Sequence, residues 1–150
     1  MGLLAIDPGK DTGWAWFLEG RLINAGVVDG DEPRGYPAPL GPGDEVIAEK
    51  PCYRRSGSGR KSTPDDLVTL GMRLGLVLGT LGFAHVPTRL VLPGEWKGQL
   101  PKAVCENRIR QALQRTELDA AHAAAARLGA KGHNLWDAVG LGLYQLRRFG

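Results

Sequence analysis

Three carboxylates stand where they could act together on one substrate: Asp7, Glu49 and Asp137. Asp7 follows the apolar run 3–6, Glu49 follows the run 45–48, and Asp137 lies in the first turn of an expected C-terminal helix. If the two runs are neighbouring strands, Asp7 and Glu49 come close together. Clustered carboxylates repel one another unless a cation neutralises them, and a hard ion such as Mg²⁺ or Mn²⁺ suits oxygen ligands. Two such ions about 4 Å apart can activate a water and stabilise the leaving oxygen of a phosphodiester.

Each of these residues also has an ordinary structural role open to it. Asp7 precedes Pro8 and Gly9 and could simply form a turn. Glu49 could be an exposed charge at the end of a strand, and Asp137 could stabilise the positive end of a helix dipole. Taken one at a time, the residues leave both roles open, and only their combination favours the chemical role.

A basic stretch follows Glu49 directly and carries five cationic side chains within twelve residues, with no acidic one among them. Such groups pair with phosphates, and an aromatic ring between them can stack on an unpaired base. The intervening glycines and serines would let the segment adapt to a branched partner, although a solvated surface loop is the alternative. The candidate binding residues are Lys50, Tyr53, Arg54, Arg55, Arg60 and Lys61, with Lys97 and Lys102 as weaker candidates.

The pattern of apolar residues predicts the elements that must position these groups. Strands are expected at 3–6, 13–18, 21–28, 45–48 and 85–92, and helices at 65–82, 102–128 and 134–149. The second helical stretch contains a possible break near Thr116, and 93–101 reads as a turn. This order predicts an α/β fold in which a five-stranded mixed sheet is flanked by helices.

The length and the distribution of charge fit this prediction. A chain of 150 residues is expected to form a single domain, 1–150, and its net charge is +3. Residues 1–49 hold nine acidic and three basic side chains, so the remainder carries an excess of nine positive charges. This asymmetry indicates a polyanion-binding surface beside a site rich in carboxylates.

The cysteines and the apolar stretches bear on the location of the protein. Cys52 and Cys105 are too few for a disulfide framework and are expected to be reduced thiols. The N-terminus lacks the pattern of a signal peptide, and the longest apolar stretch, 67–86, contains Arg73 and four glycines. We therefore expect a cytoplasmic protein with no membrane segment.

Four sequence blocks resemble the RuvC family of Holliday junction resolvases, especially its small phage-type members. They are LAIDPGKDTGWAWF (4–17), VIAEKP (46–51), PGEWKGQLPK (93–102) and HNLWDAVGLGLY (133–144). The resemblance implies an RNase H-like fold and a nuclease that depends on Mg²⁺, with two ions per site and Mn²⁺ as a substitute. It places the catalytic and metal-binding acids at Asp7, Glu49 and Asp137. It further implies symmetric nicking of four-way and other branched DNA by a homodimer.

The fourth metal-ligand position departs from the family pattern. Many members have an Asp, and some a His, three residues before the last Asp, where this chain has Asn134. His133 lies four residues before Asp137, and residues so spaced share a helix face. We expect His133 to be a metal ligand or a proton carrier, with Asn134 as the helix cap. The alternative is that His133 only caps the helix.

A dimer surface is expected on the helix 65–82. Its glycines recur at helical spacing, at 71, 75, 79 and 82, and they thin one face so that a second backbone can approach. Leu74, Leu78 and Leu81 are expected to add apolar area beside that face. The alternative is that the face packs on the sheet of the same chain.

Three other functions compete with junction resolution. The same fold and acids could cleave an RNA–DNA hybrid or a flap, and substrate preference separates these activities. Asp7 to Gly13 also resembles the phosphate-binding hairpin of sugar kinases, but those enzymes need two lobes around the nucleotide. A non-catalytic DNA-binding module is the third rival, and the intact acid set argues against it.

Overall fold

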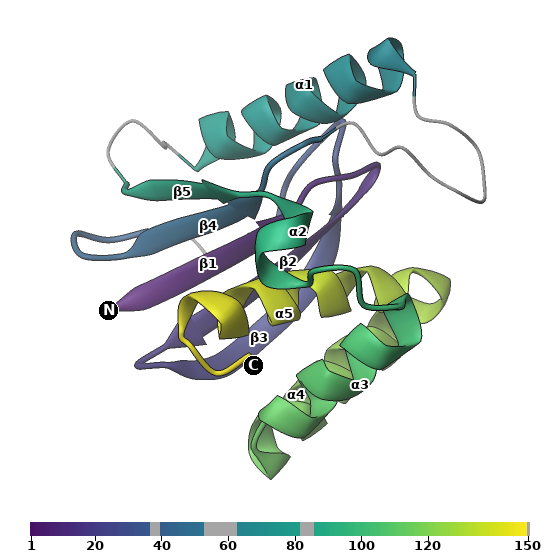
Figure 1. Cartoon of the computed structure of the whole chain (residues 1–150). Helices are drawn as coiled ribbons and strands as arrows, with labels where there is room; N and C mark the ends of the chain where they lie inside the picture. Colours follow the sequence, from purple (N-terminus) through teal and green to yellow (C-terminus); the bar gives the residue numbers. More distant parts are fainter. Residues whose placement is uncertain (37–39, 53–62, 82–85, 150) are drawn as a thin grey trace.

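The computed structural model describes residues 1–36, 40–52, 63–81 and 86–149. Its elements form three layers, with a sheet between two layers of helices (Figure 1). Helix α1 (Pro64–Thr80) covers one face of the sheet, and α4 (Arg115–Leu128) and α5 (Leu135–Gln145) cover the other. Helix α3 (Lys102–Ala112) packs against α5. The expected α/β fold is confirmed.

The sheet is mixed and has five strands in the order β3-β2-β1-β4-β5. Strands β1 (Gly2–Asp7), β2 (Asp11–Leu18) and β3 (Arg21–Asp29) form an antiparallel meander. Strands β4 (Glu45–Glu49) and β5 (Thr88–Val91) run parallel to β1. The last strand is shorter than expected: it begins at Thr88, and residues 82–85 lie outside the described part of the chain.

Two apolar cores lie on opposite faces of the sheet, and they fix which way each strand residue points. Leu3 and Ala5 belong to the core beneath α5, whereas Leu4 and Ile6 belong to the core beneath α1. Successive side chains of a strand alternate between the faces. Asp7 therefore continues the α5 side of β1, and Glu49, two residues after Ile47, continues the α5 side of β4.

Helix α1 begins with a reciprocal cap and buries a single stripe. The Thr63 side chain accepts a hydrogen bond from the Asp66 N–H, and the Asp66 carboxylate accepts one from the Thr63 N–H. Leu74, Val77 and Leu78 are buried against the sheet. Leu74, Leu78 and Leu81 were expected beside a dimer face. This expectation is wrong, because Leu74 and Leu78 form the inner stripe of the helix and Leu81 packs against the same core.

The expected long helix 102–128 is two helices, α3 and α4, which separate at Leu113. The backbone of Leu113 is extended, and Gln114 and Glu117 then form a capping box that starts α4. The predicted break is thus confirmed, a few residues earlier than Thr116. The predicted turn after β5 contains one short helix, α2 (Pro93–Trp96). No helix in the described part of the chain is long and apolar enough to cross a membrane.

Candidate active site

The carboxyl ends of β1 and β4 bring the first two acids together. The two strands are parallel neighbours in which Ile6 pairs with Ala48, so Asp7 and Glu49 follow as the next residues of the same register. Both project toward the α5 side of the sheet by the alternation described above. The Glu49 residue is only 8% exposed, and Asp7 is partly buried. The expected proximity of the strand ends is therefore present.

The turn after Asp7 is closed by a side chain that sequence analysis did not single out. The Thr12 hydroxyl donates to the carbonyl of Gly9 at 2.8 Å and accepts from the Gly9 N–H at 3.2 Å. Thr12 is fully buried, and the Gly30 N–H donates to the Lys10 carbonyl at 2.8 Å. These bonds hold the turn, and with it the position of Asp7, against the sheet.

Asp137 comes to the same place from the other layer, because it lies in the first turn of α5. The start of this helix is seated directly on β2 at Gly13, which is also the cross-strand partner of Asp7. A Cβ atom at residue 13 would clash with the backbone carbonyl oxygen of Asn134. Glycine at this position therefore allows the close approach that sets Asp137 beside the strand ends.

Lys97 lies between two of the acids, although sequence analysis predicted it as a DNA contact. Its Nζ atom is 3.1 Å from Glu49 Oε2 and 3.2 Å from Asp137 Oδ2. The side chain is 15% exposed and follows the short helix α2. Nζ also lies 4.7 Å from the centroid of the Trp96 ring, which is close enough for a cation–π interaction. One ammonium group thus bridges a carboxylate of the sheet and a carboxylate of α5, which belong to two adjacent layers.

The electrostatics of Lys97 reflect this position. Burial lowers the pKa of the Lys97 ammonium, but the carboxylates of Glu49, Asp137 and Asp7 together outweigh burial and raise it above its usual value. Lys97 is therefore protonated at neutral pH. Because Asp7 contributes to the shift, all three acids share the field of this single cation.

Trp96 holds Glu49 in place and is a second residue whose role was missed. Its indole N–H donates to Glu49 Oε2 at 2.9 Å, and the ring is buried in the core beneath α5. Nothing in the block 93–102 marks Trp96 as a partner of an acid. Its link to Glu49 depends on how α2 turns back over β4, which local sequence does not specify.

The three acids fit a divalent cation by their chemistry, since hard ions prefer carboxylate oxygens and these carboxylates surround a positive charge. Among the residues that the structure describes, however, no group of three Asp, Glu, His or Cys side chains is already arranged to hold a metal ion. Lys97 supplies the positive charge instead. Asp7, Glu49 and Asp137 are the residues that would hold a metal, and Lys97 would have to withdraw.

His133 and Asn134 differ from the acids in their surroundings. His133 lies in a 3₁₀ helix (Gly129–Asn134), is exposed, and places Nδ1 2.9 Å from the carbonyl oxygen of Ala130. Within the described residues this is its one recorded polar contact. The prediction of Asn134 as a side-chain cap is wrong: its backbone is helical and its side chain makes no capping hydrogen bond. The 3₁₀ helix runs directly into α5 and leaves no extended residue for a cap.

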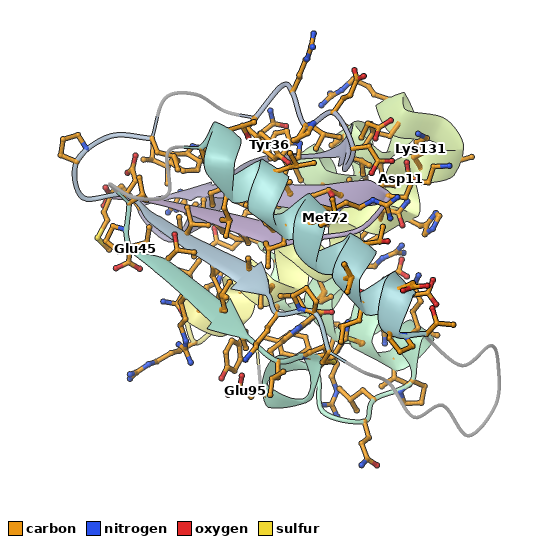
Figure 2. All side chains as sticks on the ribbon, turned by 90° about the horizontal axis from the view of Figure 1, so that it is seen from above. Asp11, Tyr36, Glu45, Met72, Glu95 and Lys131 are labelled. Carbon is orange, nitrogen blue, oxygen red and sulfur yellow. The ribbon has the colours of Figure 1, made fainter. Side chains whose placement is uncertain are left out.

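The predicted DNA-binding residues are only partly described. Tyr53, Arg54, Arg55, Arg60 and Lys61 lie outside the described residues. Lys50 and Lys102 are exposed. Near the same end of the sheet, Lys131 Nζ pairs with Asp11 Oδ1 at 2.8 Å, and Figure 2 shows the two side chains together.

No family model matches this sequence, and no curated protein matches it significantly. Two solved structures share its fold. Thermus thermophilus RuvC is 18% identical with a TM-score of 0.55, over 95% of this chain and 92% of that chain. T. thermophilus RuvC in complex with a Holliday junction substrate is 20% identical with a TM-score of 0.50, over 95% of this chain and 91% of that one. The resemblance indicated by the four sequence blocks is thus confirmed at the level of structure, and the chain has the RNase H-like fold of RuvC.

Proposed function

We propose that this chain is a metal-dependent endonuclease that resolves four-way DNA junctions and other branched DNA by symmetric nicks. The observation that carries the proposal is the meeting of Asp7, Glu49 and Asp137 around one cation at the carboxyl end of the sheet. These acids come from β1, β4 and α5 of a fold shared with RuvC, one of whose structures contains a Holliday junction substrate. The whole chain 1–150 is proposed to be this nuclease domain.

In this proposal the three acids bind Mg²⁺, in a pair of ions or with Mn²⁺ in their place, and His133 is a further ligand or a proton carrier. Bound metal supplies an activated water and stabilisation of the leaving oxygen. The chain supplies the geometry. The Trp96 indole N–H fixes one oxygen of Glu49, and the seat of α5 on Gly13 fixes the height of Asp137 above the sheet.

The proposed DNA surface lies next to the acids. Lys50 directly follows Glu49, and its backbone N–H donates to the carbonyl of Val91, so its exposed side chain starts from a fixed point beside the site. Lys102 is exposed at the start of α3. The cations of 53–61 continue this surface in the proposal, because the sequence places them directly after Lys50. Their number predicts a steep dependence of affinity on salt.

A cleavage assay with a labelled synthetic four-way junction tests the proposal, beside duplex, fork, flap and RNA–DNA hybrid controls. The expected result is paired symmetric cuts in the junction with Mg²⁺ or Mn²⁺, and none with EDTA. Asp137→Asn protein, purified in the same way, is the control for contaminating nuclease. If the protein cut the hybrid or the flap in preference to the junction, that substrate would replace the junction in the proposal. Cutting without metal would overturn the mechanism.

Two symmetric cuts require two carboxylate clusters, so we further propose a homodimer that pairs two chains through the outer face of α1. Three apolar side chains on this face are exposed: Val68 by 61%, Met72 by 65% and Leu76 by 48%. A Cβ atom at Gly71, Gly75 or Gly79 would meet nothing within 4 Å. Figure 2 looks down on this helix and labels Met72. The glycines therefore do not pack on the sheet of their own chain.

The two-fold symmetry of a junction favours a second copy of this chain as the partner on the outer face of α1. Sedimentation, which reports the oligomeric state, tests this arrangement. Gly75→Leu has open space in the isolated chain and should leave a folded monomer that nicks one strand. Leu118→Met, a change in the partly buried core, is the control and should remain dimeric. A wild-type monomer at micromolar concentration that still cuts both strands together would exclude this arrangement.

A further inference from the structure

Lys97 holds the place at which the three acids meet. Its ammonium lies 3.1 Å from Glu49 Oε2 and 3.2 Å from Asp137 Oδ2, and Asp7 adds to the same field. Carboxylate oxygens coordinate Mg²⁺ or Mn²⁺ at about 2 Å. An ion on these oxygens would therefore lie within a few ångströms of Lys97 Nζ, where two positive charges repel strongly at low dielectric. The ammonium and the ion cannot share the carboxylates without cost.

We propose that Lys97 is an internal counter-ion that competes with the divalent cation, so that metal entry requires its ammonium to leave the acid cluster. This inference rests on the proposed metal site. Its support is geometric, because the Lys97 ammonium contacts both Glu49 and Asp137 and lies in the field of Asp7. Without metal, Lys97 offsets the repulsion among the acids, and with metal the ion takes over that role.

The position of Lys97 in the chain suits a side chain that moves. Lys97 is the C-terminal cap of a four-residue helix, and Gly98 follows with a positive φ of 57°. Lysine has a flexible four-carbon stem, and its compact ammonium makes no bidentate fork with a carboxylate. The backbone N–H of Lys97 donates to the Pro93 carbonyl at 3.0 Å. The backbone therefore stays anchored while the side chain can rotate away.

Calorimetric titration with Mn²⁺, in the absence of DNA, measures the competition directly. Lys97→Met removes the charge and keeps a side chain of similar length over Trp96. Its Mn²⁺ affinity should rise by about tenfold or more over the wild type, because a unit charge about 3 Å from the ligand atoms is gone. Lys97→Arg keeps the charge and should bind no tighter than the wild type. Arg115→Met removes an exposed charge on α4 and should match the wild type.

Thermal unfolding with and without Mn²⁺ gives a second readout. Lys97→Met loses the ammonium that contacts Glu49 and Asp137, so its melting temperature should fall without metal and rise more steeply with Mn²⁺ than that of the wild type. Lys97→Gln, which is neutral but still a hydrogen-bond donor, replaces Lys97→Met if that variant does not fold without metal. In the Asp137→Asn background both metal responses should shrink, which locates them at this site.

The outcomes separate this inference from the proposed function. Wild-type protein that binds Mn²⁺ and cuts junctions, while Lys97→Met and Lys97→Gln bind Mn²⁺ no tighter, would overturn the counter-ion role alone. If both variants bound Mn²⁺ more tightly but the wild-type protein never cut nucleic acid, the counter-ion role would stand and the proposed nuclease function would be overturned. Absence of Mn²⁺ binding in every variant would overturn both.

Discussion

Two groups of charges in this molecule are built in opposite ways. In the first, a single carboxylate, Glu117, accepts hydrogen bonds from both terminal nitrogens of Arg148, at 2.8 and 2.6 Å, and from the backbone N–H groups of Leu22 and Gln114. In the second, three carboxylates share the one ammonium of Lys97. The Glu117 side chain is 2% exposed, while that of Asp137 is 30% exposed.

The difference separates a charge that holds the fold from the charges that we propose to bind metal. Arg148 also donates to the carbonyls of Gly20 and Ala112, so the first group ties together the β2–β3 hairpin, α3 and α4. Every acceptor there has its donor, as buried charge requires. The second group gathers three carboxylates at a partly open edge of the sheet. Carboxylates gathered in this way suit the uptake of a cation.

The largest expected effect is on cleavage and comes from the acid cluster. Asp7→Asn, Glu49→Gln and Asp137→Asn should each lower the junction cleavage rate by at least about a hundredfold, because each removes a charge that would hold metal. Junction binding, measured in Ca²⁺, should stay within a few fold of the wild type. A near-normal rate in Mg²⁺ for any one of them would remove that residue from the proposed site.

Breaking the other group should have the reverse outcome. Arg148→Met leaves Glu117 buried without its counter-ion and should lower the free energy of unfolding by about 3–5 kcal/mol. Denaturant unfolding measures this loss. Cleavage per folded molecule at low temperature should remain normal, because the pair lies away from the acid cluster. Loss of cleavage with unchanged stability would contradict the division between the two groups.

The stability that Glu117 contributes should depend on pH. Burial alone would raise the pKa of Glu117, but the hydrogen bonds from Arg148, Gln114 and Leu22 outweigh it and lower the pKa from 4.5 to about 2. A depressed carboxyl pKa contributes stability that is present above the unfolded value and lost as the pH falls through the folded one. Between pH 4.5 and 2 the wild type should therefore lose about 3 kcal/mol from this group. In Arg148→Met the loss over that interval should be much smaller, which unfolding at a series of pH values will show.

The smallest expected effect concerns His133. If it is a ligand or a proton carrier, His133→Ala should slow cleavage about tenfold and change the pH profile of the rate. His122→Ala removes an imidazole on α4 that packs edge-on against Trp136, and it is the control for the loss of a ring contact near α5. If the variant had an unchanged pH profile and only a lower melting temperature, His133 would have a structural role through its contact with the Ala130 carbonyl and no part in the reaction.

Sequence patterns predicted most of the sheet because burial on both faces leaves a clear trace. β1 and β4 are short runs of mostly apolar residues, and each ends at its acid, so Asp7 and Glu49 were expected to meet if the two strands were neighbours. That the strands are neighbours, and in which register, came only from the structure. Helix α1 was harder to orient, because apolar residues occur on more than one of its faces. Periodicity did not reveal that Leu74 and Leu78 face inward while Met72 and Leu76 remain outside.

The centre of the site could not be predicted for a different reason. Lys97 and Trp96 reach Glu49 only because α2 folds back over the end of β4, and a helix of four residues leaves almost no periodic signal. Lys97 was noticed for its charge and assigned to the partner rather than to the acids. Asn134 was assigned as a cap because its residue type suits that position, whereas the preceding 3₁₀ helix made a side-chain cap unnecessary.

The site also depends on a residue without a side chain, Gly13. It pairs with Asp7 across the hairpin and lies against the carbonyl of Asn134, so one missing side chain sets the spacing between two layers of the molecule. Even a methyl group there would push the start of α5 away from β2 and so displace Asp137 from Lys97. In a library of random variants selected for activity, position 13 should consequently be as intolerant of change as position 7, although it has no side chain to take part in the chemistry.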